Sequence, residues 1–140
     1  MEISELVKLA MKARENSYSP YSNFRVGAAL LTKQGKVYSG CNIENAGQTS
    51  SNCAERTAFF KAVSEGEREF AAIAIVGGPA DGIKDYCPPC GVCRQVMMEF
   101  CDCETFKIII AKSEEDYQIF TLQQLLPMGF GPKDLSEKPN

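Results

Sequence analysis

The apolar residues of this chain recur with two spacings, one typical of amphipathic helices and the other of buried strands. Helical spacing predicts three main helices, which cover about residues 4–16, about residues 54–65 and a segment from about residue 91. Ser4 is the expected N-cap of the first helix. The third helix is expected to bury Val92, Val96 and Phe100.

Short apolar or β-prone runs predict strands at residues 24–32, 37–43, 70–76, 106–111 and 117–120. A turn at Gln34-Gly35 joins the first two strands into a hairpin. Thr121 and Gln124 fit a capping box that opens a short helix ending at Leu126.

This order of elements predicts a single α/β domain over residues 1–140: a three-layer α/β/α sandwich with a mixed sheet of about five strands. After the hairpin, each strand-helix-strand connection favours parallel pairing.

Composition narrows the function classes. With 140 residues and a net charge of -3, the chain lacks the broad basic surface that binding to polymeric nucleic acid needs. The N-terminus has no signal-peptide pattern, and no apolar stretch approaches the ~20 residues of a membrane span. We therefore expect a cytoplasmic protein that acts on neither a membrane nor a nucleic-acid polymer.

The chain has seven cysteines and no histidine. In a cytoplasmic protein, this many cysteines indicates metal or thiol chemistry more than disulfides. The absence of histidine excludes zinc sites that need imidazole and nucleophiles that need a histidine base. Cysteine and acidic side chains are left as the possible protein ligands.

Three cysteines lie where helices are expected to begin. The pair Pro88-Pro89 cannot lie inside a helix, so Cys90 falls at the start of the third helix and Cys93 lies on the same face. Cys53 occupies the equivalent place on the second helix. Helix N-termini stabilise thiolates, so these sulfur atoms could bind one zinc ion and leave its fourth position open, as in catalytic sites.

The sequence also allows two other kinds of metal site. Cys87, Cys90 and Cys93 begin like a ferredoxin iron-sulfur motif, although the next ligand position is Met97. Alternatively, Cys87, Cys101 or Cys103 could close a structural zinc site as a fourth ligand.

Glu55 and Arg56 follow the first cysteine directly. Glu55 could merely complete a capping box with Asn52, but a ligand-x-Glu motif followed by Pro-Cys-x-x-Cys is the layout of zinc deaminases, in which the glutamate shuttles protons. Three thiolates would make the zinc site anionic, and Arg56 could offset that charge from the second shell. The alternative for Arg56 is an ordinary solvated helix charge.

Nearly the whole chain resembles the small, homotetrameric, zinc-dependent cytidine deaminases of pyrimidine salvage. Five blocks in the same order carry the resemblance, namely residues 18–28, 40–46, 53–58, 89–95 and 125–132. One departure concerns Gln48, because family members commonly have an aromatic residue there. This departure leaves base specificity and subunit packing open.

The resemblance implies hydrolysis of cytidine and 2′-deoxycytidine to uridine or deoxyuridine plus ammonia, by zinc-bound hydroxide and a glutamate shuttle. It implies these roles: Cys53, Cys90 and Cys93 as Zn²⁺ ligands, Glu55 as proton shuttle, Arg56 in the second shell, and Phe24, Asn42, Glu44, Ala54 and Phe130 as substrate contacts. Asn42 and Glu44 would bind the ribose hydroxyls, Phe24 would line the base pocket, and Phe130 would reach into a neighbouring subunit's site.

Three alternatives stay open. The first is a zinc deaminase of another aminopyrimidine nucleoside or base, and the second is an editing deaminase on RNA or DNA, which the acidic charge disfavours. The third is a non-catalytic zinc or redox-sensing module, which leaves Asn42, Glu44 and Glu55 without a role.

Overall fold

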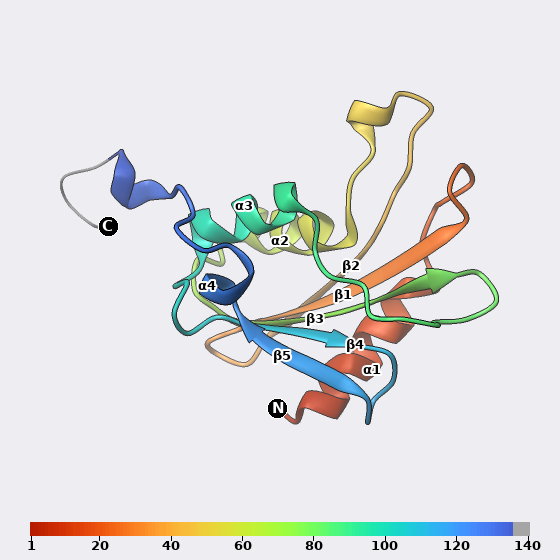
Figure 1. Cartoon of the computed structure of the whole chain (residues 1–140), viewed down its shortest axis with the longest axis horizontal. Coiled ribbons are helices and arrows are strands. Elements are labelled where there is room, and N and C mark those ends of the chain that lie inside the picture. Colours follow the sequence, from red (N-terminus) through yellow and green to blue (C-terminus); the bar gives the residue numbers. More distant parts are fainter. Residues whose placement is uncertain (136–140) are drawn as a thin grey trace.

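The computed structural model describes residues 1–135 and contains a five-stranded sheet in the order β2-β1-β3-β4-β5. The elements are, in chain order, α1 (Ile3–Arg14), β1 (Phe24–Thr32), β2 (Val37–Cys41), the 3-10 helix η1 (Gln48–Ser50), α2 (Ala54–Ser64), β3 (Phe70–Pro79), α3 (Gly91–Phe100), β4 (Lys107–Ala111), β5 (Tyr117–Thr121), α4 (Leu122–Leu125) and the 3-10 helix η2 (Pro132–Asp134). Figure 1 shows α1 on one face of the sheet and α2 and α3 on the other. The predicted α/β/α sandwich is therefore confirmed.

The central strand β3 shows why both faces need helices. Its Ile73 and Ile75 side chains join the apolar core under α2 and α3, whereas Ala74 and Val76 join the core under α1. Successive side chains of a strand point to opposite faces, so a strand that is apolar on both faces must be covered twice.

Strand pairing is mixed and only partly as predicted. The β3–β4 pair is parallel, as expected for two strands joined through α3. The connection through α2, however, carries the chain past β1, so β3 pairs antiparallel with β1 and does not pair with β2. β3 also runs to Pro79, beyond its predicted end, because residues 77–79 pair with the start of β1.

Several predicted boundaries were wrong by a few residues. Ser4 is not a cap, because α1 begins one residue earlier and its N-cap position is Glu2, without a side-chain cap. β2 ends at Cys41, and Ile43 makes only isolated bridges. The capping box at Thr121 is confirmed, with both reciprocal hydrogen bonds formed.

The inward face of α3 differs from the prediction. Val92 is 57% exposed, whereas Cys93 and Met97 are fully buried. Cys93 faces the other two cysteines, and a neighbouring residue on a helix is rotated by about 100°. Val92 therefore points outward.

Close packing fixes the start of α2 over the sheet. A Cβ atom on Gly40 of β2 would lie 2.6 Å from both the Ala54 carbonyl oxygen and the Ala58 nitrogen. Only glycine allows β2 to approach the first turns of α2 so closely.

Among residues 1–135, no helix is both long enough and apolar enough to cross a membrane.

Candidate active site

The site begins where two helices start side by side. Cys53 is the N-cap residue of α2 and Cys90 that of α3, both with extended backbone and neither with a side-chain cap. Cys93 lies one turn into α3 and is buried. Both positive helix ends and their free amides therefore point at the three sulfur atoms.

The spacing of the sulfur atoms matches a metal site. Cys53 Sγ lies 3.8 Å from Cys90 Sγ, which lies 3.6 Å from Cys93 Sγ, and all three are within 4.8 Å of one another. Tetrahedral bonds of about 2.3 Å to one zinc ion would separate two sulfur ligands by about 3.8 Å. The residues present therefore fit zinc.

Arg56 adds positive charge to this cluster. Its Nη2 donates to Cys53 Sγ at 3.2 Å. Hydrogen bonds from the Cys93 thiol and from Arg56 lower the pKa of Cys53 to about 5, although burial opposes the shift. The same contacts raise the pKa of Arg56, which stays a cation. The structure thus favours a thiolate at Cys53.

Glu55 is a buried carboxyl group beside the cluster. Only 4% of its surface is exposed, and burial raises its pKa to about 7. Its own backbone amide opposes that shift, the Cys53 thiolate adds to it, and Arg56 opposes it. No side-chain cap forms at Cys53, and Asn52 Nδ2 donates instead to Thr57 Oγ1, so the capping-box interpretation of Glu55 was wrong.

A cavity of about 330 Å³ opens beside these groups. Predicted site residues on its wall are Asn42, Glu44, Cys53, Ala54, Glu55, Arg56 and Cys90. Residues that the sequence did not assign to the site also line it: Val26, Ser51, Asn52, Cys87 and Pro88. Gln48, the departure from the family pattern, lies on this wall as well.

Asn42 and Glu44 hold neighbouring backbone segments. Asn42 accepts from the Val26 amide at 2.9 Å and donates to the Phe24 carbonyl at 2.8 Å. Glu44 accepts from the backbone amides of Tyr21 and Ser22 and from the Ser22 hydroxyl. These contacts lower the pKa of Glu44, with the Ser22 hydroxyl as the largest cause. No local pattern in the chain predicted these partners.

Two predicted contacts lie outside the cavity wall. Phe24 is 40% exposed, and one atom of its ring is 3.1 Å from where a Cβ on Gly77 would stand. Phe130 is 56% exposed, and its carbonyl accepts from Gln95 at 2.7 Å. Within one described chain, the Phe130 ring is not brought to the site.

The competing cysteine sites are not formed. Among residues 1–135, Cys53, Cys90 and Cys93 are the only group whose ligand atoms come together as a metal site would require. Cys87 lines the cavity as a neutral thiol, because burial, together with the charges of Glu55 and Cys53, raises its pKa to about 12. Cys101 and Cys103 belong to no such group, so neither the iron-sulfur run nor the closed four-cysteine zinc site is supported.

Comparison with known proteins agrees with this geometry. Residues 1–110 match the family described as the cytidine and deoxycytidylate deaminase zinc-binding region. The chain is 49% identical to a cytidine deaminase from Halalkalibacterium halodurans over 98% of this chain and 100% of that protein. It is 46% identical to one from Sporosarcina psychrophila over 97% of this chain and 96% of that protein.

Comparison with solved structures also finds cytidine deaminases. The crystal structure of cytidine deaminase from Burkholderia pseudomallei has a TM-score of 0.85 and 46% identity, covering 93% of this chain and 100% of that one. Cytidine deaminase from Mycobacterium tuberculosis has a TM-score of 0.79 and 34% identity, covering 94% of this chain and 98% of that one.

Proposed function

This chain belongs to the zinc-dependent cytidine deaminase family, and from that premise we propose that it hydrolyses cytidine and 2′-deoxycytidine to uridine or deoxyuridine and ammonia. One observation carries the proposal. Glu55 is a buried carboxyl group on the wall of the cavity that Cys53 and Cys90 also line.

The proposed zinc ligands are Cys53, Cys90 and Cys93, held at two helix starts. When bound there, zinc supplies a Lewis acid that acidifies water. Arg56 keeps electron density off Cys53 by donating to its sulfur atom. Its guanidinium thus offsets part of the negative charge of the three thiolates.

Glu55 is the proposed proton carrier. Its carboxylate takes one proton from the attacking water and passes it to the ring nitrogen. It then takes the second proton from the oxygen now bonded to the ring carbon and passes it to the amino group, so that the carbon-nitrogen bond breaks and ammonia leaves. A pKa near 7 suits a group that must both accept and donate a proton at neutral pH. Burial, which raises this pKa, also keeps bulk water away from the proton.

Asn42 and Glu44 are the proposed ribose contacts. Each uses some of its hydrogen-bonding groups to hold the backbone of residues 21–26, which fixes its side chain on the cavity wall. Ala54 on the same wall and Phe24 beside it are the proposed base contacts. Preorganised polar groups of this kind give specificity for a diol.

The decisive test is Glu55→Gln. The amide keeps the shape of the side chain but cannot accept and release a proton at neutral pH, so turnover should fall by at least the ~10²–10⁴-fold expected of an acid-base group. The zinc content should stay at one per chain. Ultraviolet absorbance follows the loss of cytidine, and metal analysis follows zinc. Glu99→Gln, an exposed carboxylate on α3, is the matched control and should remain active.

The same assay separates related substrates. Cytidine should be consumed and free cytosine should not, because the ribose contacts hold the substrate, and a chelator should abolish the activity. Turnover of cytosine alone would contradict the proposal, as would substantial activity of Glu55→Gln.

The protein's wider organisation is part of the proposal. The whole chain of 140 residues forms one deaminase domain that works in the cytoplasm, in salvage of pyrimidine nucleosides. Four copies assemble, and Phe130 of each enters a neighbouring site. The exposure of its ring and its absence from the cavity wall of its own chain support this arrangement.

A further inference from the structure

Arg14, the last residue of α1, donates hydrogen bonds to three backbone carbonyl groups. Its Nε donates to the Arg25 carbonyl at 3.2 Å, and its Nη2 donates to the Gly78 carbonyl at 3.0 Å and to that of Pro79. A planar guanidinium can serve several acceptors from one fixed position, which an ammonium cannot do as well. Arg14 thus links α1 to two strands of the sheet.

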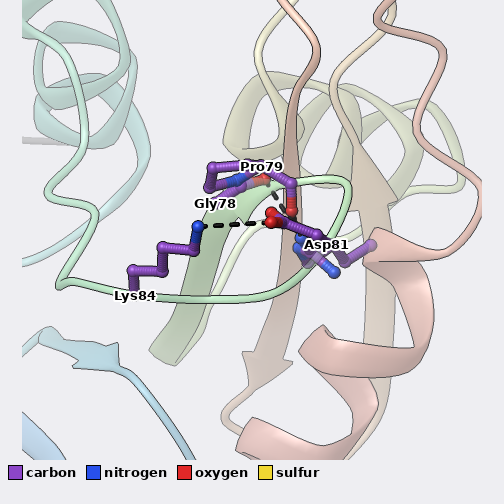
Figure 2. A network of polar contacts seen from close by, with 5 residues as sticks. Gly78, Pro79, Asp81 and Lys84 are labelled. Atoms are coloured by element: carbon purple, nitrogen blue, oxygen red, sulfur yellow. Dashed lines mark hydrogen bonds and ion pairs between the residues drawn. The ribbon is translucent and has the colours of Figure 1, made fainter.

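The three carbonyl groups lie at one end of the sheet. Arg25 is paired with Gly78, and Phe24 with Pro79, in the last two steps of the β1–β3 ladder. Figure 2 shows Gly78 and Pro79 beside Asp81, whose carboxylate pairs with Lys84 at 3.3 Å. Burial and the neighbouring positive charge of Arg25 lower the pKa of Arg14, and the negative charge of Asp81 opposes this shift.

This end of the sheet supports one wall of the cavity. The Phe24 carbonyl accepts from Asn42, and Asn42 in turn accepts from the Val26 amide. Both Val26 and Asn42 line the cavity. A shift in the first residues of β1 would therefore move the polar group proposed to bind the ribose.

The end of β3 supports another part of the cavity wall. A Cβ on Gly77 would stand 2.8 Å from Cys87 Sγ and 3.1 Å from the Phe24 ring, so both side chains pack directly on this glycine. Cys87 lines the cavity. Gly78 and Pro79, which follow Gly77, are two of the residues that Arg14 holds.

We propose that Arg14 is a positioning residue. By joining the ends of β1 and β3, it fixes the positions of Asn42 and Cys87 on the cavity wall relative to each other, and so the affinity for the nucleoside. The proposal rests on the proposed function for its substrate. Arg14 does not line the cavity and takes no part in proton transfer.

The test compares Arg14→Met and Arg14→Lys with the wild-type holoenzyme. In Arg14→Met we expect KM for cytidine to rise about tenfold, kcat to change less than about threefold and zinc to stay at one per chain, because uniform binding is lost and not the chemistry. The Kd for the product uridine should rise in parallel. For Arg14→Lys, KM for cytidine and Kd for uridine should lie between those of the wild type and those of Arg14→Met.

Arg68→Met is the matched control. Arg68 also donates to two backbone carbonyls, those of Val63 at 2.9 Å and Glu67 at 2.8 Å, but neither residue lines the cavity. Its loss should leave KM and uridine binding unchanged. If Arg14→Met does not fold, Arg14→Lys alone tests the proposal, and we expect its KM for cytidine to rise by about threefold or more.

A measurement without substrate keeps this test separate from the proposed function. Amide hydrogen exchange should quicken in residues 24–28 and 76–88 of the Arg14 variants but not in 37–41 of β2. A wild-type protein that does not deaminate cytidine would refute the proposed function alone. Unchanged exchange in these segments, or Arg14 variants with wild-type KM and uridine Kd, would refute the positioning role.

Discussion

Arg56 is bound to the cysteine cluster by a hydrogen bond that its place in the sequence does not reveal. It donates to Cys53 Sγ, while its buried Nε has no hydrogen-bond partner within residues 1–135. An unpaired buried donor is costly, so the structure keeps this cation beside the sulfur atoms at some loss of stability.

Arg56→Gln tests this role. Removing the guanidinium should weaken zinc binding by about 10–100-fold, the usual effect of removing a group that hydrogen-bonds to a metal ligand. Competition with a chromogenic chelator measures the affinity. Lys61→Gln removes a positive charge from the same helix away from the cavity and should bind zinc like the wild type; equal affinities for all three proteins would contradict the assignment.

Glu44 gives a prediction about pH and stability. Because the Ser22 hydroxyl and two backbone amides lower its pKa below the ordinary value of 4.5, its contacts stabilise the folded state above that pH and are lost as pH falls through the lower folded-state pKa. Glu44→Gln should therefore unfold at lower denaturant concentration than wild type at pH 7.

The same difference should shrink below about pH 4.5, where the unfolded-state carboxylate takes up its proton. Urea unfolding of the two proteins across this range, with zinc present throughout, measures it. Glu104→Gln, which removes an exposed carboxylate, should show no such dependence. A constant difference from pH 7 to pH 3 would show that these contacts are not linked to protonation.

The helices α2 and α3 owe their place to the sheet below them. Local patterns predicted both helices and the start of each at a cysteine, because apolar spacing and the Pro88-Pro89 pair are short-range signals. The pairing of β1 with β3 was not predictable in that way, since it joins residues that are far apart in the chain, such as Phe24 and Pro79.

Gly40→Ala tests the contact between β2 and α2. The new methyl group would overlap the backbone of Ala54 and Ala58, so we expect a loss of about 1–3 kcal/mol in the free energy of unfolding. Because Cys53 precedes that turn directly, zinc affinity should fall too. Gly91→Ala is the control, because no atom lies within 4 Å of its new Cβ, and it should be as stable as wild type.

At the scale of the whole molecule, the segment after α4 exposes large apolar side chains. Phe130 is exposed, and Met128 in the same segment is fully exposed. In Figure 1, the segment after α4 leads away from the sheet. Assembly of four chains of 15.4 kDa would give these apolar side chains a partner.

Subunit mixing tests this assembly. Phe130→Ala should fold normally but lose activity, because a neighbouring site lacks its aromatic wall, and light scattering of the wild type should show a tetramer. Mixed after dissociation, Phe130→Ala and Glu55→Gln subunits should regain activity, since each mutant lacks a different half of the site. Leu135→Ala, another exposed apolar residue near the C-terminus, should stay active alone. An active monomer, or a mixture without recovery, would contradict the role of Phe130 between subunits.

The sequence by itself determined the chemistry available to this protein. Seven cysteines without histidine, two of the proposed ligands at helix starts and a glutamate two residues from one of them are set by residue type and short-range spacing. Tertiary structure decided which cysteines meet, because Cys53 and Cys90 are 37 residues apart and come together only through the packing of α2 and α3 on one sheet face. It also decided that Cys87 stays a neutral wall of the cavity, that Glu55 is buried enough to hold a proton near pH 7, and that Arg14 holds the strand ends, since burial and long-range contacts leave no periodic signal in the chain.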